Sequence, residues 1–139
     1  MPTTTPIQVR FSDMDMARHA NNAIYLTWFE QGRMDLLRQF IEKHHDWRQQ
    51  GMILARNEVD YRHPVHLGDQ VEVETWCTKV GTKSFELGYA LHIVKGTERM
   101  LSAEGRSVMV CFDYDSGKTI ALPAAWRKAL EAMKEGSLS

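Results

Sequence analysis

The chain has 139 residues, and its 17 Lys and Arg nearly balance 18 Asp and Glu, giving a formal net charge of −1 at pH 7. This length suits one domain over residues 1–139, and the balanced charge lacks the basic field that nucleic-acid binding requires. No apolar run approaches the roughly 20 residues of a membrane span, and residues 1–6 lack a secretory signal pattern, so we expect a cytoplasmic protein.

The first predicted elements are a short strand and a long helix. Residues 7–11 alternate apolar and polar side chains, which is typical of a strand. Apolar side chains then recur with helical spacing over residues 22–43, and their broad stripe predicts a helix packed on more than one side. Asn21 or Asn22 is a suitable N-cap for this helix. A short polar loop therefore separates the strand from the helix.

The rest of the chain predicts an antiparallel meander followed by a short C-terminal helix. Apolar and polar side chains alternate in four stretches, at residues 58–63, 71–77, 85–93 and 103–112. The final helix begins at Pro123. The expected fold is α+β, with about five antiparallel strands wrapped around one long central helix, because that helix is the only long apolar element available to cover the sheet.

The polar loop contains the residues best suited to chemistry, which are Asp13, Asp15 and His19. The first N–H groups of a helix lack internal partners and carry partial positive charge, so they stabilise an oxyanion. The N–H groups in question belong to Asn22, Ala23 and Ile24. Asp15 beside them would act on a carbonyl as nucleophile or as general base toward water. The residues alone leave both roles open, and they equally allow a carboxylate that only braces the loop.

Residues 13–25 read DMDMARHANNAIY. This segment resembles the Asp-x-Asp-x-x-Gly-His-x-Asn-Asn-x-x-Tyr signature of hotdog-fold acyl-CoA thioesterases in the 4-hydroxybenzoyl-CoA thioesterase-like family. The resemblance implies hydrolysis of an acyl-CoA to a free acid and CoA, with Asp15 as the catalytic residue and no cofactor. It also implies a substrate pocket lined by His19, Asn21 and Tyr25.

Arg18 departs from the signature, which has Gly at this position. Gly there would serve a backbone angle that other residues adopt at a strain of roughly 1 kcal/mol. Either the loop follows a different path in this chain, or Arg18 has a function of its own. Binding an acidic acyl group or a CoA phosphate is one such function.

The other polar residues of the loop have structural alternatives. Asp13 is expected mainly to bond the loop backbone, with a catalytic role beside Asp15 as the alternative. His19 orients Asp15, lines the acyl pocket, or is a structural imidazole. The three residues offer too few ligands for a metal ion, and no downstream residue adds an obvious ligand, so we expect no metal.

A second segment, KVGTKSF at residues 79–85, resembles the part of related enzymes that lies near the CoA nucleotide across a subunit interface. Its candidate CoA-binding residues are Lys79, Lys83 and Ser84. Lysines at a hairpin tip are also common on any soluble protein, which is the alternative. Because relatives place the active site between subunits, the resemblance implies a homodimer or homotetramer.

Two other functions remain open at this stage. A thioesterase acting on acyl carrier protein would need a basic patch around Lys79, Lys83 and Arg106 to bind that acidic partner. A non-catalytic acyl-CoA-binding module would bind the substrate without turnover, although such a module gains little from a carboxylate at Asp15 beside an anionic ligand.

Overall fold

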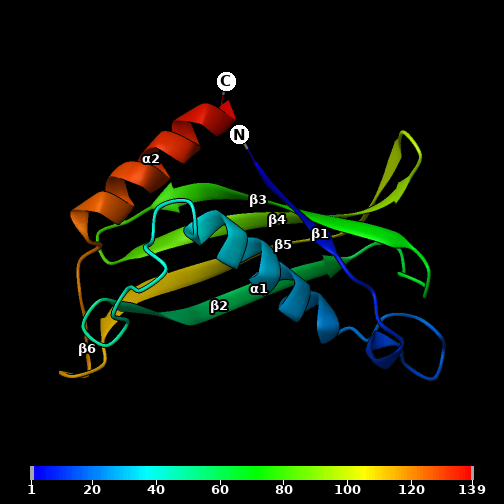
Figure 1. The fold of residues 1–139 in the computed structure, drawn as a ribbon, viewed down its shortest axis with the longest axis horizontal. Helices are drawn as coiled ribbons and strands as arrows, with labels where there is room; N and C mark the ends of the chain where they lie inside the picture. Colours follow the sequence, from blue (N-terminus) through cyan, green and yellow to red (C-terminus); the bar gives the residue numbers. More distant parts are fainter. Residues whose placement is uncertain (1, 139) are drawn as a thin grey trace.

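One antiparallel sheet forms most of the molecule (Figure 1). The computed structural model describes residues 2–138, with side chains described through residue 134. The strands are β1 (Thr3–Ile7), β2 (Gly51–Tyr61), β3 (Gln70–Val80), β4 (Ser84–Lys95), β5 (Glu98–Asp113) and β6 (Lys118–Thr119). The helices are α1 (Ile24–Leu37) and α2 (Ala124–Leu138), and a short 3-10 turn spans Phe11–Asp13. Neither helix is long and apolar enough to span a membrane.

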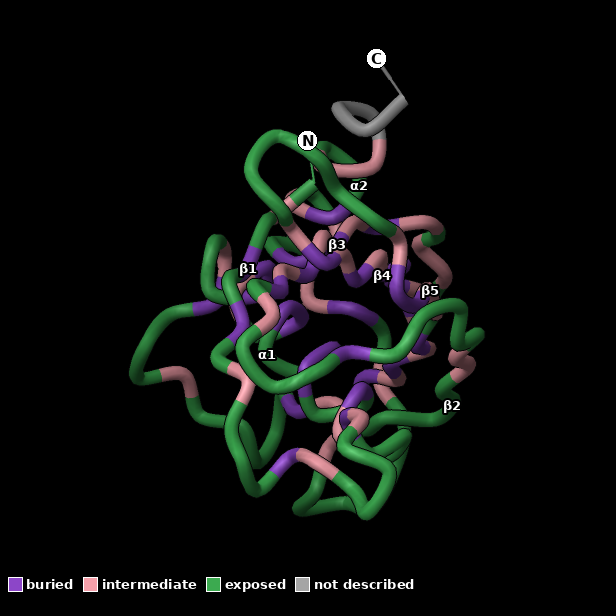
Figure 2. The backbone as a smooth tube through the Cα atoms, turned by 90° about the vertical axis from the view of Figure 1, so that its right-hand side faces the viewer, coloured by how far each residue is buried: buried purple, intermediate pink, exposed green. Residues whose placement is uncertain are grey.

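The strand order is β1-β3-β4-β5-β2, with β6 paired to the end of β5. The predicted alternation of apolar and polar side chains is present in the central strands. The faces of β3 and β4 that carry the apolar side chains are buried along most of their length. α1 packs mainly on β1, β3 and β4, and Figure 1 shows it lying across one face of the sheet. β2 lies at the sheet edge, and residues 53–57 of this strand are exposed (Figure 2).

Both helix lengths correct the expectations. α1 ends at Leu37 and has 14 residues, so the long helix predicted over residues 22–43 is wrong. Beyond Leu36 some backbone hydrogen bonds shorten to three-residue spacing, with Gln39 N–H donating to Leu36 O and Phe40 N–H donating to Leu37 O. Ile41 lies after the end of the helix and is nevertheless buried. The apolar spacing in the sequence therefore extended beyond the helix itself. α2 has 15 residues and is not the short helix expected.

Strand boundaries also differ from the expectations. The first strand is Thr3–Ile7, not residues 7–11, and Phe11 is 81% exposed. β2 begins at Gly51, well before the predicted start at residue 58. An edge strand with little burial shows no alternation of apolar and polar side chains, which explains the late prediction. β6, with two residues, has no sequence signal.

Gly32 allows α1 to approach the sheet closely. A Cβ atom at this position would lie 2.5 Å from Thr75 Oγ1 and 2.9 Å from Val73 Cγ1, both on β3. With the helix at this distance, Phe29 stacks on Tyr89 of β4 with ring centroids 4.6 Å apart. The position of α1, and therefore of its N-terminus, depends on the missing side chain at Gly32.

We expect Gly32→Ala to lower the free energy of unfolding by about 1–3 kcal/mol, because overpacking at the helix–sheet contact outweighs the better helix propensity of Ala. Chemical denaturation measures this change. Gln31→Ala on the exposed face of the same helix is the control and should stay within about 0.5 kcal/mol. A double variant with Thr75→Ala should recover part of the loss; an unchanged stability for Gly32→Ala would contradict this account of the packing.

Candidate active site

The loop of residues 14–22, here called the Asp15 loop, is held at both ends by backbone hydrogen bonds. Ala20 N–H donates to Val65 O at 2.8 Å, and Asn21 N–H donates to Asp13 O at 2.8 Å. Within the loop, Asp15 N–H donates to His19 O at 2.8 Å. These bonds close the loop into a compact turn directly before α1.

Asp13 has the structural role that was expected. Its side chain is buried, with one oxygen accepting a hydrogen bond from Arg10 N–H at 2.9 Å and the other from the Arg10 guanidinium at 2.9 Å. A buried carboxylate is stable only when it is paired in this way. Asp13 therefore anchors the start of the loop, and it does not line the cavity described below.

Asp15 is exposed, and its two carboxylate oxygens differ. Oδ1 accepts hydrogen bonds from Ala17 N–H at 2.9 Å and His19 N–H at 3.2 Å, which braces the loop. Oδ2 has no hydrogen-bond partner among the described residues. The carboxylate thus combines a fixed orientation with one oxygen available for chemistry.

A cavity of about 350 Å³ lies beside Asp15 at the N-terminus of α1. It is lined by Asp15, His19, Ala20, Asn22, Tyr25, Tyr61, Arg62, His63 and Pro64. The structure therefore brings together four of the predicted site residues from the loop and helix. Asn21 does not line the cavity but shapes its wall, as described below.

The end of β2 forms the opposite side of this cavity. Tyr61 O–H donates to Asn22 O at 2.7 Å, and its ring contacts Tyr25 edge-on with centroids 5.0 Å apart. Burial, and to a smaller extent Tyr25, raises the pKa of Tyr61, so its hydroxyl stays protonated. Sequence reasoning missed Tyr61, Arg62 and His63 as site residues. Only the pairing of β2 with β5 brings them to the helix N-terminus.

Asn21 organises the first turn of α1. Its side-chain oxygen accepts a hydrogen bond from Ala23 N–H at 3.0 Å, and its backbone oxygen accepts one from Ile24 N–H at 2.9 Å. Of the three N–H groups predicted to bind an oxyanion, two are therefore engaged. Asn22 N–H has no partner among the described residues, so it is the donor available to a ligand.

His19 contacts another histidine. Its ring lies edge-on to His66, with centroids 4.9 Å apart, and the two residues also form an isolated β-bridge. His19 is half-buried and lines the cavity. The described residues include no group of three or more His, Cys, Asp or Glu side chains arranged to hold a metal ion.

Comparison with known proteins places this arrangement in a family. A family model described as the thioesterase-like superfamily matches residues 9–130, which include the whole Asp15 loop, α1 and the central strands. The chain belongs to the thioesterase-like superfamily.

Individual relatives agree with this assignment. The putative acyl-CoA thioesterase YneP of Bacillus subtilis is 28% identical over 134 residues, which cover 93% of this chain and 95% of YneP. The long-chain acyl-CoA thioesterase FadM of Escherichia coli is also 28% identical over 134 residues, covering 93% and 97%. The structure of a predicted thioesterase from Bacillus stearothermophilus has a TM-score of 0.85 and 32% identity, with 96% of each chain covered. The predicted hotdog thioesterase family and thioester hydrolase class are confirmed.

Arg18 of this thioesterase-like chain adopts the backbone conformation that Gly favours. Its φ is 64°, and it is the one non-glycine residue with positive φ in the described part of the chain. The loop has therefore not taken an ordinary β or right-handed conformation to accommodate Arg18. The side chain is exposed and has no ion-pair partner among the described residues.

We expect Arg18→Gly to have a higher free energy of unfolding than Arg18→Ala, by roughly 0.5–1 kcal/mol, because left-handed strain in Ala exceeds the entropy that Gly loses on folding. Urea denaturation of both variants measures the difference. Ala17→Gly is the control at a neighbouring position without positive φ and should lower stability. Equal or greater stability of Arg18→Ala would contradict the strain at this position.

The candidate CoA-binding residues lie far from Asp15 within one chain. Ser84 begins β4 and pairs with Val110, whereas Tyr61 at the Asp15 cavity pairs with Ala103. The two positions are seven residues apart along β5, or roughly 23 Å. Figure 1 shows the β3–β4 turn and the Asp15 loop at opposite ends of the sheet. The turn itself is ordered by Gly81 N–H donating to Ser84 O at 2.7 Å.

Proposed function

We propose that this protein hydrolyses acyl-CoA thioesters to a free acid and CoA, with Asp15 as the catalytic carboxylate. The observation that carries the proposal is the pairing, in one cavity, of Asp15 with a free Oδ2 and Asn22 with an unused N–H. Relatives named as acyl-CoA thioesterases support CoA as the carrier.

The geometry supports two routes that share one transition-state interaction. The thioester carbonyl oxygen rests on Asn22 N–H at the positive end of α1, so charge that develops on this oxygen is stabilised. Ala23 N–H adds a second donor when the Asn21 side chain releases it, and Ile24 N–H continues the same positively charged turn. His19 and Tyr25 then hold the acyl group against the cavity wall.

In the nucleophilic route, Asp15 Oδ2 bonds to the carbonyl carbon, the C–S bond breaks, and CoA leaves as a thiolate. Water then hydrolyses the resulting mixed anhydride and restores the carboxylate. In the general-base route, Asp15 takes a proton from water as that water attacks the carbonyl, and the proton is passed to the departing thiolate. An acid-quenched single turnover separates them, because only the first route leaves an acylated Asp15 peptide for mass spectrometry.

We expect Asp15→Asn to lower kcat/KM for acyl-CoA by roughly 100-fold or more, because the amide keeps an acceptor for the loop bonds but removes the reactive carboxylate. Thiol release with a chromogenic reagent measures this change. Asp115→Asn, an exposed carboxylate of the β5–β6 turn, is the matched control and should retain full activity. Undiminished activity of Asp15→Asn would assign the chemistry elsewhere, and acyl-CoA binding without turnover in the wild type would indicate a binding module.

We further propose that the complete site forms between two copies of the chain. β2 is an edge strand with Ile53 and Leu54 exposed, and such an edge is normally covered in a stable protein. The distance between Asp15 and the β3–β4 turn is easily explained if Lys79, Lys83 and Ser84 serve the Asp15 cavity of a partner subunit. A homodimer, or a homotetramer built from it, meets both requirements.

Subunit mixing tests the shared site. Asp15→Asn and the double variant Lys79→Ala/Lys83→Ala should each show low kcat/KM at limiting substrate. After they are denatured together and refolded, half of the dimers are mixed, and one of their two sites is intact. We expect recovery of about a quarter of wild-type activity. No recovery, with dimers verified by light scattering, would place all these residues in sites of a single chain.

Docking of an acyl carrier protein is less well supported. Arg106, one of the three residues needed for a basic patch, is paired with Glu58 at 2.9 Å on β2. The positive charge of Arg106 is therefore already compensated by Glu58. The exposed positive charges that remain, Lys79 and Lys83, match the phosphates of CoA better than an extended acidic protein surface.

A further inference from the structure

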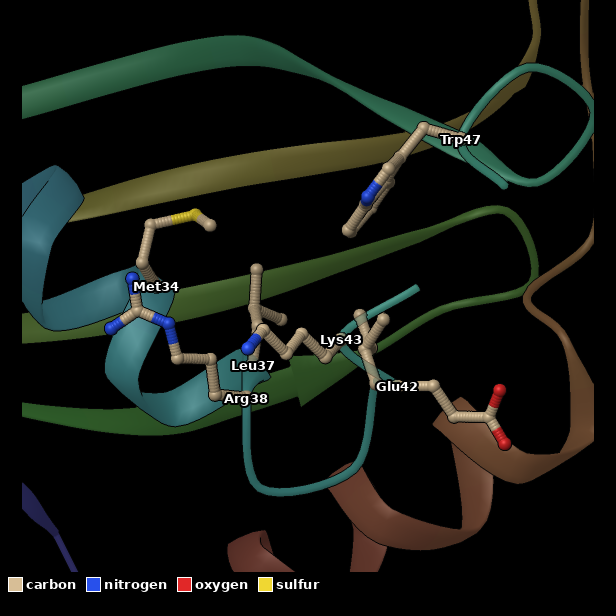
Figure 3. Close-up of a pocket in the computed structure, with 7 residues that line it drawn as sticks. Met34, Leu37, Arg38, Glu42, Lys43 and Trp47 are labelled. Carbon is tan, nitrogen blue, oxygen red and sulfur yellow. The ribbon is translucent and has the colours of Figure 1, made fainter. Parts of the chain in front are cut away.

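A second cavity lies at the opposite end of α1 from Asp15 (Figure 3). Its volume is about 440 Å³, within the range typical of small-ligand sites. It is lined by Met34, Leu37, Arg38, Ile41, Glu42, Lys43 and Trp47. In Figure 3, Met34 and Trp47 lie on opposite sides of the space, and Leu37 points into it.

Four of the seven residues that line the cavity are apolar and suit an apolar occupant, and the other three, Arg38, Glu42 and Lys43, are charged. Leu37 and Ile41 are buried and form its floor, whereas Met34 and Trp47 are each 38% exposed despite their size. Trp47 is held in place by His45, with ring centroids 4.7 Å apart, and it lies near the buried Trp126 of α2. Large apolar side chains that stay exposed around a cavity indicate a binding surface. The indole of Trp47 closes the end of this cavity that lies away from Asp15.

The two cavities lie near opposite ends of one helix. From Ile24, the first residue of α1 and the neighbour of the cavity-lining Tyr25, to Met34 and Leu37 at the second cavity, α1 advances about 15–20 Å. An extended chain advances about 1.2 Å per bond, so this distance matches a straight carbon chain of roughly 12–16 atoms. A compact aromatic or short acyl group bound at Asp15 would not reach the second cavity.

Apolar side chains are also exposed on α1 and on β2. Leu26 of α1 and Leu54 and Tyr61 of β2 are each more than a third exposed. Leu54 and Tyr61 face the inner side of the sheet, because they pair with the buried residues Met109 and Ala103. The buried cation on this stretch, Arg33, donates to the Tyr89 hydroxyl at 3.1 Å.

We propose that the second cavity receives the distal part of a straight-chain acyl group whose thioester lies at Asp15, and that Trp47 sets the maximum chain length. The inference rests on the proposed acyl-CoA hydrolysis and names its substrate class as acyl chains of about 12 carbons or more. Each methylene buried in the cavity strengthens binding by about fourfold, so long chains outcompete short ones.

The test compares butanoyl-, octanoyl-, dodecanoyl- and hexadecanoyl-CoA, with kcat/KM from thiol release and Kd from calorimetry. Met34→Trp fills the cavity and should lower the dodecanoyl-to-butanoyl ratio of kcat/KM at least tenfold. Trp47→Ala opens the far end and should move the preferred chain length upward. Met100→Trp, which introduces the same side chain on the distant β4–β5 hairpin, is the control and should keep the wild-type ratio. Thermal unfolding verifies that each variant is folded.

The outcomes separate this inference from the proposed function. Ratios that stay within threefold of wild type in both cavity variants overturn the inference, while hydrolysis by the wild type still supports the function. A change in oligomeric state of Met34→Trp without a change in chain-length ratio also overturns it, and assigns the cavity to contact with a second copy. If the wild type hydrolyses none of the four substrates, the proposed function fails, and the same ratios taken from Kd decide whether the cavity holds the chain.

Discussion

The close contact between α1 and β3 at Gly32 is the constraint on which the rest of the structure depends. Because no side chain separates the helix from Thr75 and Val73, α1 lies low enough for Phe29 to stack on Tyr89. This contact fixes the height of the helix above the sheet, and the backbone bond between Ala20 and Val65 fixes its starting point. Both the Asp15 cavity and the distal cavity are defined by the position of this one helix.

The two oxygens of the Asp15 carboxylate separate its structural role from the chemical role that we propose for it. One oxygen of Asp15 holds the turn by accepting two backbone N–H groups, and the other is free. The bracing bonds hold the carboxylate in the wall of the cavity that Asn22 also lines. A thioester suits so small a set of groups, because its carbonyl is electrophilic and its thiolate leaves readily.

The uncovered side of the sheet connects the remaining features. α1 covers β1, β3 and β4, which leaves the inner face of β2 with Leu54 and Tyr61 exposed. A second copy of the chain and an acyl group are not competing occupants here, because a chain lying along α1 would be enclosed when a partner covers the edge at β2. In the proposed arrangement, subunit association covers the edge at β2 while the acyl chain occupies the space along α1, so the two bury neighbouring apolar surfaces.

The sequence by itself determined the local features of this protein. Alternation along the central strands identified their buried faces, and the motif at residues 13–25 located the loop, its catalytic candidate and the family. It also marked Arg18 as the departure from the Gly of the signature, and the structure then showed that the backbone is left-handed there. These features are local, because strand alternation and turn conformation are set by neighbouring residues.

The tertiary structure decided which distant residues meet. Tyr61, Arg62 and His63 join the Asp15 cavity because β2 pairs with β5, whereas Lys79 and Lys83 lie at the other end of the sheet. The tertiary structure also decided that α1 ends at Leu37, because Ile41 is buried although it lies in the turn after the helix. A buried apolar residue at helical spacing therefore does not show whether the helix continues or has already ended.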